Sequence, residues 1–260
     1  MKIATWNING VKARLPVVLE WLRQSAPDVA CLQEIKSVYD AFPRAEFEEL
    51  GYSVETHGQK GFNGVAILSR TPADEVTRGL PGDESDEQAR FMEAVFASPS
   101  GPLRVISLYL PNGNPVETPK YDYKLAWMDR LVAWTRDRLA MEEAFALLGD
   151  YNVVPSEADK FESPAWDADA LWLLPSREHY RKLRGLGLYE AIECVGDEPG
   201  RYTFWDYQAG AWPKNKGMRI DHALLSPQAA DRLRGATIDK HVRDWEKPSD
   251  HVPVVVEIAD

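Results

Sequence analysis

Short apolar runs recur along the chain, and their length is typical of β-strands rather than of helices. The runs that we interpret as strands lie at 3–6, 29–33, 52–56, 64–68, 91–97, 103–109, 145–149, 202–205, 219–225 and 252–258. Three longer stretches, at 11–25, 118–139 and 176–186, predict helices instead. In the first of these, apolar residues recur three, four and seven positions after Leu15, which places them on one helical face.

The links between these runs are of two kinds. Runs 52–56 and 64–68, and likewise 91–97 and 103–109, are joined by hairpin-length segments, whereas other runs are separated by predicted helices. Hairpins join antiparallel strands and helices usually join parallel ones, so the pattern predicts mixed sheets rather than a doubly wound parallel sheet. Neither G-x-G-x-x-G nor a Walker-type loop occurs, which disfavours a nucleotide cofactor.

Six polar clusters border the apolar runs. Four of them follow a run: T-W-N at 5–7, L-Q-E at 32–34, Y-L-P-N at 109–112 and G-D-Y-N at 149–152. Two precede a run: R-I-D-H at 219–222 and S-D-H at 249–251. If the late strands are antiparallel to the early ones, all six polar ends meet at one rim of the fold, and we expect the functional site there.

The acidic and amide members of these clusters suit a metal-assisted reaction on phosphate. Asp150 and Asn152 leave one face of an extended segment, where their oxygens could hold a hard cation or orient water, although an Asx turn is the simpler interpretation. Glu34 is suited to Mg²⁺ but would be unremarkable alone. Asn7 and Asn9 are also explained by turn chemistry before Gly10.

Other members suit the binding of a phosphate. His251, beside Asp250, could donate to a phosphate oxygen, or could be an ordinary surface histidine. Asp221 is a carboxylate suited to orienting an imidazole. Tyr109, which ends an apolar run, is explained equally well as part of the core. The absence of G-x-S-x-G disfavours covalent acyl chemistry.

Composition and charge limit the classes of function. The chain has 260 residues, 44% of them hydrophobic, and because the clusters span nearly its whole length we expect one domain over 1–260. The net charge of −11 counts against a nucleic-acid partner, but residues 181–250 are balanced, with Lys214, Lys216 and Arg219 close together. The two cysteines, Cys31 and Cys194, indicate reduced thiols in a cytoplasmic protein without a membrane span.

The clusters and their neighbours closely resemble the exonuclease III family of apurinic/apyrimidinic endonucleases, within the endonuclease/exonuclease/phosphatase superfamily. The resemblance covers nearly the whole chain and includes I-A-T-W-N-I-N-G, L-Q-E-I-K, Y-L-P-N-G, K-Y-D-Y-K-L-A-W, L-G-D-Y-N-V-V-P, T-F-W-D-Y-Q-A-G, N-K-G-M-R-I-D-H and W-E-K-P-S-D-H-V-P-V. It implies an α/β four-layer sandwich, in which two mixed sheets pack together with helices outside, and Mg²⁺ or Mn²⁺ at the rim.

The resemblance also implies a role for each site residue. Glu34 would be the principal metal ligand beside Asn7 and Asp250. Asp150 would activate or position the attacking water and Asn152 would help to hold it, both close to the metal. Asp221 would orient His251, which also lies near the metal, toward the scissile phosphate. The phosphate and the DNA would be contacted by Tyr109, Asn112 and Asn114. An extruded abasic sugar would be contacted by Phe204, Trp205 and Met218.

The implied reaction is cleavage of duplex DNA 5′ to an abasic site by a monomer that leaves a 3′-hydroxyl, with trimming of blocked 3′ ends by exonuclease and phosphatase activity. Substrate preference would depend partly on the 208–216 loop, which contains Trp212-Pro213. Two alternatives remain open at this point. One is a phosphodiesterase or phosphatase of the same superfamily that acts on lipid or inositol phosphates. The other is a non-catalytic DNA-binding protein on the same fold.

Overall fold

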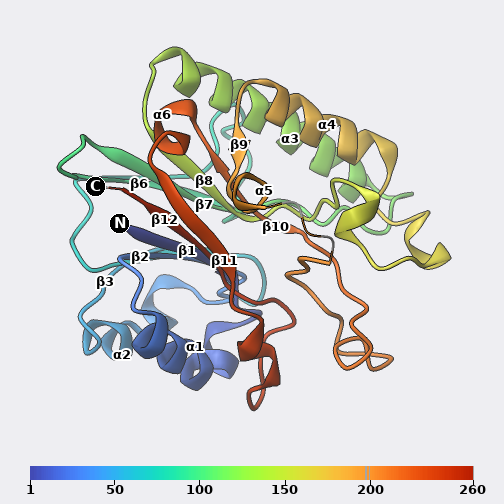
Figure 1. Ribbon diagram of the computed structural model, residues 1–260, viewed down its shortest axis with the longest axis horizontal. Coiled ribbons are helices and arrows are strands. Elements are labelled where there is room, and N and C mark those ends of the chain that lie inside the picture. The colour runs from blue at the N-terminus through green and yellow to red at the C-terminus, as the bar shows by residue number, and fades with distance from the viewer. Residues whose placement is uncertain (197, 199, 260) are drawn as a thin grey trace.

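Two six-stranded mixed sheets form the centre of the computed structural model, which describes residues 1–196, 198 and 200–259 (Figure 1). The strand order is β11-β12-β1-β2-β4-β3 in one sheet and β5-β6-β7-β8-β10-β9 in the other. The strands are β1 (Lys2–Asn7), β2 (Val29–Gln33), β3 (Ser53–His57), β4 (Val65–Ser69), β5 (Glu75–Arg78), β6 (Phe91–Phe96), β7 (Leu103–Tyr109), β8 (Phe145–Asp150), β9 (Tyr189–Glu190), β10 (Asp221–Leu225), β11 (Leu233–Ile238) and β12 (Val254–Ile258).

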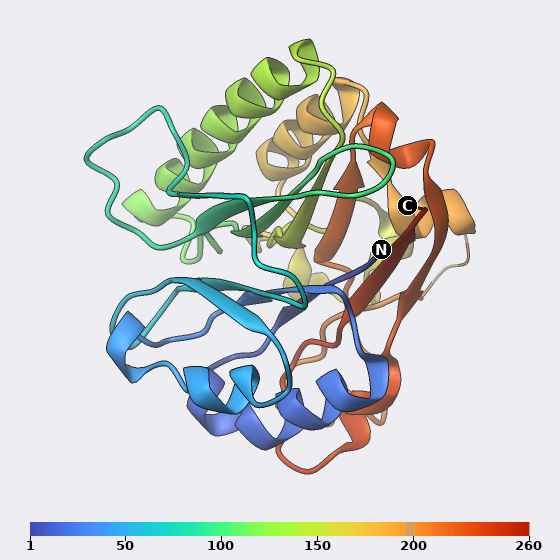
Figure 2. The same cartoon turned by 90° about the vertical axis from the view of Figure 1, so that its left-hand side faces the viewer.

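Helices cover the outer face of each sheet, so the molecule has four layers (Figure 2). The α-helices are α1 (Val11–Ser25), α2 (Arg44–Glu48), α3 (Pro119–Ala140), α4 (Leu174–Gly185), α5 (Ala191–Val195) and α6 (Pro227–Ala230). Helices α1 and α2 lie against the first sheet, and α3 and α4 lie against the second. This arrangement confirms the predicted fold class. In the described part of the chain, no helix is both long and apolar enough to cross a membrane.

The central strands are buried on both faces, which explains why they are nearly continuous apolar runs. Between the sheets, Ile3 and Cys31 of the first sheet share a core cluster with Leu148 of the second. On the outer faces, Trp6 packs edge-on against Trp21 of α1 with ring centroids 5.5 Å apart, and Phe91 packs against α3. Each sheet therefore has apolar contacts on both sides.

The strand directions bring the polar clusters together. Strands β1 and β2 are parallel, as are β7 and β8, so the polar groups that follow these strands lie at one end of each sheet. Strand β12 is antiparallel to β1 and β10 is antiparallel to β8, so the polar groups that precede β12 and β10 reach the same end. The expected convergence of the six clusters is therefore confirmed.

The prediction of a strand at 202–205 is wrong. In this segment only Phe204 makes bridges, one to Met218 and one to His251. The apolar side chains of this segment are buried although it forms no strand. In the sequence, such a buried run has the same pattern as a strand. The strand predicted at 219–225 begins at Asp221. Strands β5, β9 and β11 were not predicted, because they are short or partly exposed and lack an apolar run.

Candidate active site

The rim where the six clusters meet is connected by hydrogen bonds between side chains. The Asn7 amide at the end of β1 donates to Glu34 Oε1 at 3.0 Å and to Asp150 Oδ2 at 2.9 Å. Tyr109 at the end of β7 donates its hydroxyl to Glu34 Oε1 at 2.8 Å. Since Glu34 follows a strand of the first sheet and Asp150 ends a strand of the second, these bonds span both sheets and bring four of the predicted residues together.

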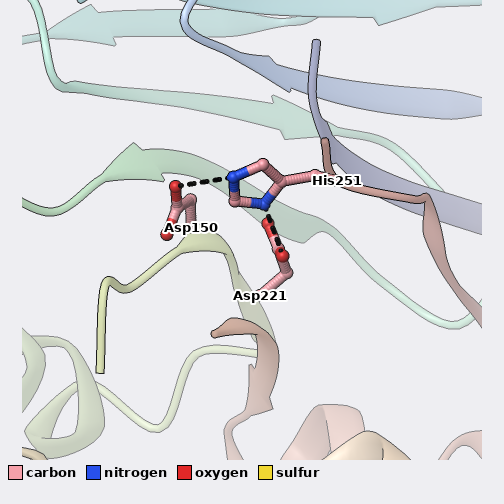
Figure 3. A group of neighbouring side chains, drawn as sticks. All are labelled: Asp150, Asp221 and His251. Carbon is pink, nitrogen blue, oxygen red and sulfur yellow. Dashed lines mark hydrogen bonds and ion pairs between the residues drawn. The ribbon is translucent and has the colours of Figure 1, made fainter. Parts of the chain in front are cut away.

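Asp150, Asp221 and His251 form its most buried part (Figure 3). The side-chain positions follow from the strand register, in which Asp221 of β10 pairs with Asp150 of β8. His251 Nδ1 lies 2.8 Å from Asp221 Oδ2, and His251 Nε2 lies 3.7 Å from Asp150 Oδ2. The imidazole is therefore held between two carboxylates, and the orienting role expected for Asp221 has the geometry that it requires.

Burial and charge shift the pKa values of this group in a consistent way. Burial raises the pKa of Asp150 to about 7, although the charge of His251 opposes the change. Burial alone would lower the pKa of His251, but the carboxylates of Asp221 and Asp150 outweigh it and raise that pKa to about 10. At neutral pH His251 is thus an imidazolium, a cationic donor, and Asp150 lies close to its own titration point.

Glu34 is ionised for a different reason. Burial would raise its pKa, but hydrogen bonds from Asn7 and Lys36 outweigh burial and lower it. The Lys36 ammonium lies 2.9 Å from Glu34 Oε2. Beside this carboxylate, burial raises the pKa of Tyr109 well above 10, and the charge of Glu34 adds to the effect. Tyr109 is therefore a neutral phenol that donates a proton in a hydrogen bond.

Asp250 is connected to this group through a residue that the sequence had suggested only as part of a turn. Asn9 donates to Asp250 Oδ1 at 3.0 Å and accepts from Lys36 Nζ at 2.5 Å. Ser249 Oγ donates to the backbone oxygen of Asn7 at 2.7 Å. Lys36 was not predicted as a site residue. Its position two residues after Glu34, beside a cluster of polar and acidic residues, would have indicated it.

The amides after β7 and β8 form a second connected group. Asn112 donates to Asn152 Oδ1 at 3.0 Å, and Asn152 donates to the Leu110 carbonyl at 2.9 Å. Asp150 Oδ1 accepts from the Asn152 backbone N–H, so the Asx turn that was the simpler interpretation is present together with the site geometry. Asn114 donates its backbone N–H to Asn112 Oδ1 at 3.2 Å and its side-chain amide to Asp169, and it lines the groove that adjoins the site.

The residues expected to line a sugar pocket differ in their exposure to solvent. Phe204 packs against the His251 ring, with centroids 4.9 Å apart, and is partly accessible. Met218 is buried in the cluster next to Phe204. Trp205 is 0% exposed and packs on Trp212, so the expectation that its ring lines an open pocket needs correction. Its apolar surface is used in the core cluster below α1.

The donor set fits a hard divalent cation. Three carboxylates, from Glu34, Asp150 and Asp221, lie within one connected rim, and oxygen is the ligand that Mg²⁺ prefers. Asp221 Oδ1 is buried and has no hydrogen-bond partner among the described residues. Burial is the main cause of the raised pKa of Asp150, and the nearby charge of Asp221 adds to it.

A groove of about 700 Å³ adjoins the rim through Asn112. Its lining is rich in amides and also contains Arg90, Lys120 and the exposed ring of Phe62. The Arg90 guanidinium stacks over the ring of Tyr109, 4.9 Å from its centroid, and so links the groove to the site. Arg90 and Lys120 supply positive charge on a molecule that is acidic as a whole.

Comparisons with known proteins agree with this geometry. The model of the Endonuclease/Exonuclease/phosphatase family matches residues 4–251. The chain is 33% identical to Exodeoxyribonuclease III of Haemophilus influenzae over 99% of both chains. Among solved structures, it resembles the 3′ phosphatase NExo from Neisseria bound to a product DNA hairpin (TM-score 0.95, 36% identity, 100% of both chains). It also resembles an AP endonuclease from Archaeoglobus fulgidus (TM-score 0.93, 34% identity, 99% of both chains).

Proposed function

The chain belongs to the Endonuclease/Exonuclease/phosphatase family, and from this membership we propose that it is a metal-dependent DNA-repair nuclease. Its substrate is duplex DNA with abasic sites or blocked 3′ ends, which it cleaves as a cytoplasmic monomer built as one domain over 1–260. The observation that carries the proposal is the full-length similarity to exodeoxyribonuclease III and AP endonucleases, combined with a connected rim of acids, amides and one imidazolium.

Hydrolysis of a phosphodiester needs an acceptor for the proton of the attacking water. Asp150 takes this role, because its raised pKa makes it a stronger base than an ordinary aspartate. Asn152, which is fixed by the amide of Asn112 and by Asp150, holds the water. A base with a pKa near the working pH is the most effective one, and a value of about 7 meets this condition.

The reaction also needs donors where negative charge develops on the phosphate. His251 supplies one through Nε2, because its Nδ1 is bonded to Asp221, which fixes the orientation of the ring. Tyr109 supplies a neutral hydroxyl, which would turn from Glu34 toward the phosphate. Asn112 and Asn114 contact the phosphate and the DNA backbone. Phe204 and Met218 contact the abasic sugar, since a nucleotide without a base costs little to unstack.

Mg²⁺, or Mn²⁺ in its place, is the proposed cofactor. Glu34 would be its main ligand, with Asn7 and Asp250 beside it and with Asp150, Asn152 and His251 close by. When bound, the ion would neutralise charge on the phosphate and on the departing 3′-oxygen. Glu34 is prepared for this role because it is ionised and buried between hydrogen-bond donors.

One assay tests the proposal. A labelled duplex with a single abasic site is incubated with the protein and Mg²⁺, and in parallel with a chelator, beside a matched duplex that has no lesion. We expect a nick 5′ to the lesion with Mg²⁺ only, and slower release of nucleotides from the 3′ end of the intact duplex. Inositol phosphates are tested in the same buffer. Phosphate release from them without nicking of DNA would refute the proposal in favour of the phosphodiesterase alternative.

A further inference from the structure

A lysine that takes no part in the proposed chemistry lies directly behind the amide group of the site. Lys124, on α3, is 0% exposed. Its ammonium donates to the backbone carbonyls of Asn112 at 3.0 Å, Asn152 at 2.6 Å and Ala170 at 3.1 Å. The three carbonyls belong to three loop segments, one after β7 and two at opposite ends of the connection between β8 and α4. All three protons of the ammonium are therefore used on backbone oxygens.

Two of these loops carry amides that the proposed reaction uses. Asn152 has a φ of 47°, in the left-handed region, which asparagine tolerates better than most residues with a side chain. Its carbonyl accepts from Lys124 at the shortest of the three distances, 2.6 Å. Its side-chain oxygen accepts from Asn112, whose own carbonyl is bonded to the same ammonium. One ammonium thus fixes the backbones of two residues whose side chains are bonded to each other.

We propose that Lys124 is a positioning residue of the nuclease, whose ammonium holds Asn112 and Asn152 in the paired arrangement that orients the attacking water beside Asp150. The inference rests on the proposed function. Lys124 does not touch the water or the phosphate and acts through the two loops. Its hydrogen bonds to described residues all go to carbonyls, and burial lowers the pKa of Lys124 to about 7, although the charges of Asp169 and Asp150 oppose the change.

The third loop extends the same arrangement to Asn114. The Ala170 N–H donates to Asn114 Oδ1 at 3.1 Å, and Asn114 donates to Asp169 at 3.1 Å. The stem of the lysine is also enclosed, because a Cβ at Gly113 would lie 2.7 Å from Lys124 Cδ. Gly113 has a φ of 90°, so both the conformation and the space at this position favour glycine. The loop after β7 is therefore shaped around the lysine.

Burial of a lysine is unusual, and its cost is offset only where the ammonium is fully hydrogen-bonded. A neutral side chain of the same length would fill the space as well, but the carbonyls of Asn112 and Asn152 would lose the donor that they share, while the Ala170 carbonyl would keep Ser176 Oγ at 2.6 Å. The loops would then relax independently. For an in-line reaction, displacement of a water-holding group by about 1 Å reduces the rate on the order of 100-fold.

The test compares Lys124→Met, which keeps the stem and removes the ammonium, with Lys182→Met, which makes the same change at an exposed site on α4. Nicking of the abasic duplex is measured in single turnover at saturating DNA, with DNA affinity and the folded fraction measured in the same buffer. We expect Lys124→Met to react about 100-fold more slowly with DNA affinity changed less than about 3-fold. Lys182→Met should match the wild type.

A second variant separates positioning from packing. In Lys124→Ala, propylammonium should restore part of the rate, and propanol of similar size should not. Full activity of folded Lys124→Met, equal rescue by propanol, or a rate loss no larger than the loss of folded protein would overturn the proposal. Failure of both variants to fold, even with propylammonium, would also overturn the proposal, since the role of Lys124 would then be structural. An inactive wild type would instead refute the proposed nuclease function.

Discussion

At the scale of single residues, the site separates its charges by environment. Asp150 and Asp221 are both buried, yet Asp221 is bonded to His251 Nδ1 while Asp150 lies farther from the ring, at 3.7 Å from Nε2. Burial raises the pKa of the Asp150 carboxylate, which suits a base, whereas Asp221 orients the imidazole through its hydrogen bond. Two residues of the same type thus acquire different roles.

This division gives a prediction for Asp150→Asn and His251→Ala. Each should lose about 3–4 kcal/mol of transition-state stabilisation, which corresponds to a fall in kcat on the order of 10²–10³-fold, because each removes a group that acts on developing charge or on the water. Initial rates of nicking at saturating duplex and Mg²⁺ measure the change. Asp122→Asn, a matched change at an exposed position on α3, should be silent. Near-full nicking by either site variant would mean that its assigned role is wrong.

The same two groups make the stability of the protein depend on pH. The pKa of Asp150 is raised to about 7 and that of His251 to about 10, so the folded state binds both protons more tightly than the unfolded chain does. Their contribution to the free energy of unfolding is therefore lost as pH rises, from about 4 through 7 for Asp150 and from about 6.5 through 10 for His251.

Urea denaturation in chelator, between pH 5 and 10, checks this expectation. As pH rises over this range, the wild type should lose stability relative to the double variant Asp150→Asn/His251→Gln, which lacks both groups. The opposing contributions of Lys124 and His222, whose pKa values burial lowers, are common to the two proteins. Parallel curves for the two proteins would contradict the pKa shifts on which the proposed roles of these residues depend.

At the scale of elements, the segment before β10 is held by buried ion pairs. Arg219 lies two residues before Asp221, and its guanidinium contacts Asp159 at 2.7 Å, Glu190 at 2.9 Å and Glu193 at 2.8 Å. These partners come from the loop after β8, from β9 and from α5. The ion pairs therefore fix the start of β10, and with it the position of the Asp221 carboxylate, against the neighbouring elements.

Arg219→Met should consequently destabilise the fold by about 3–5 kcal/mol, because it leaves the fully buried Glu190 carboxylate without its cation. The measurement is the free energy of unfolding from urea titration at neutral pH. Lys247→Met, which removes a lysine whose side chain is 79% exposed, is the control and should change stability by less than about 0.5 kcal/mol. An equally small effect at Arg219 would show that the network does not stabilise this segment.

The helices and strands predicted from the sequence are accurate where apolar residues recur at regular spacing. Helix α1 has the predicted bounds, because its apolar face repeats regularly and the chain turns left-handed at Ala26. The segment around Trp205 was mistaken for a strand, since burial alone does not distinguish a strand from a loop that crosses a core. Strand β11 was missed because its side chains are half-exposed and an edge strand needs no apolar run.

At the scale of the whole molecule, the substrate must bind to a protein with a net charge of −11. Binding therefore depends on a local surface, where Arg90 and Lys120 line the groove beside the site. Lys214 and Lys216 are exposed in the 208–216 segment. Screening by salt weakens these local contacts with phosphate, and the acidic remainder of the surface adds no attraction.

We accordingly expect DNA affinity to fall steeply with salt. For about four neutralised phosphates, an increase from 50 to 200 mM KCl should weaken binding on the order of 100-fold. Titration of fluorescent duplex at several salt concentrations, with chelator present to prevent cleavage, gives the slope. Lys214→Met should reduce the slope by about 1 if this lysine contacts a phosphate, and Lys182→Met should leave it unchanged. A slope near zero would contradict the predicted electrostatic contribution.

The sequence by itself determined the chemistry and the architecture. The apolar runs, their bordering clusters and their link lengths were local features, and local features specify strands, helices and candidate ligands such as Glu34 and Asp150. Only the tertiary structure decided which groups touch. Asn9 connects Asp250 with Lys36, Lys124 joins segments on either side of α3, and Trp205 lies in the core. These outcomes depend on burial and on strand register between distant residues, which no local pattern encodes.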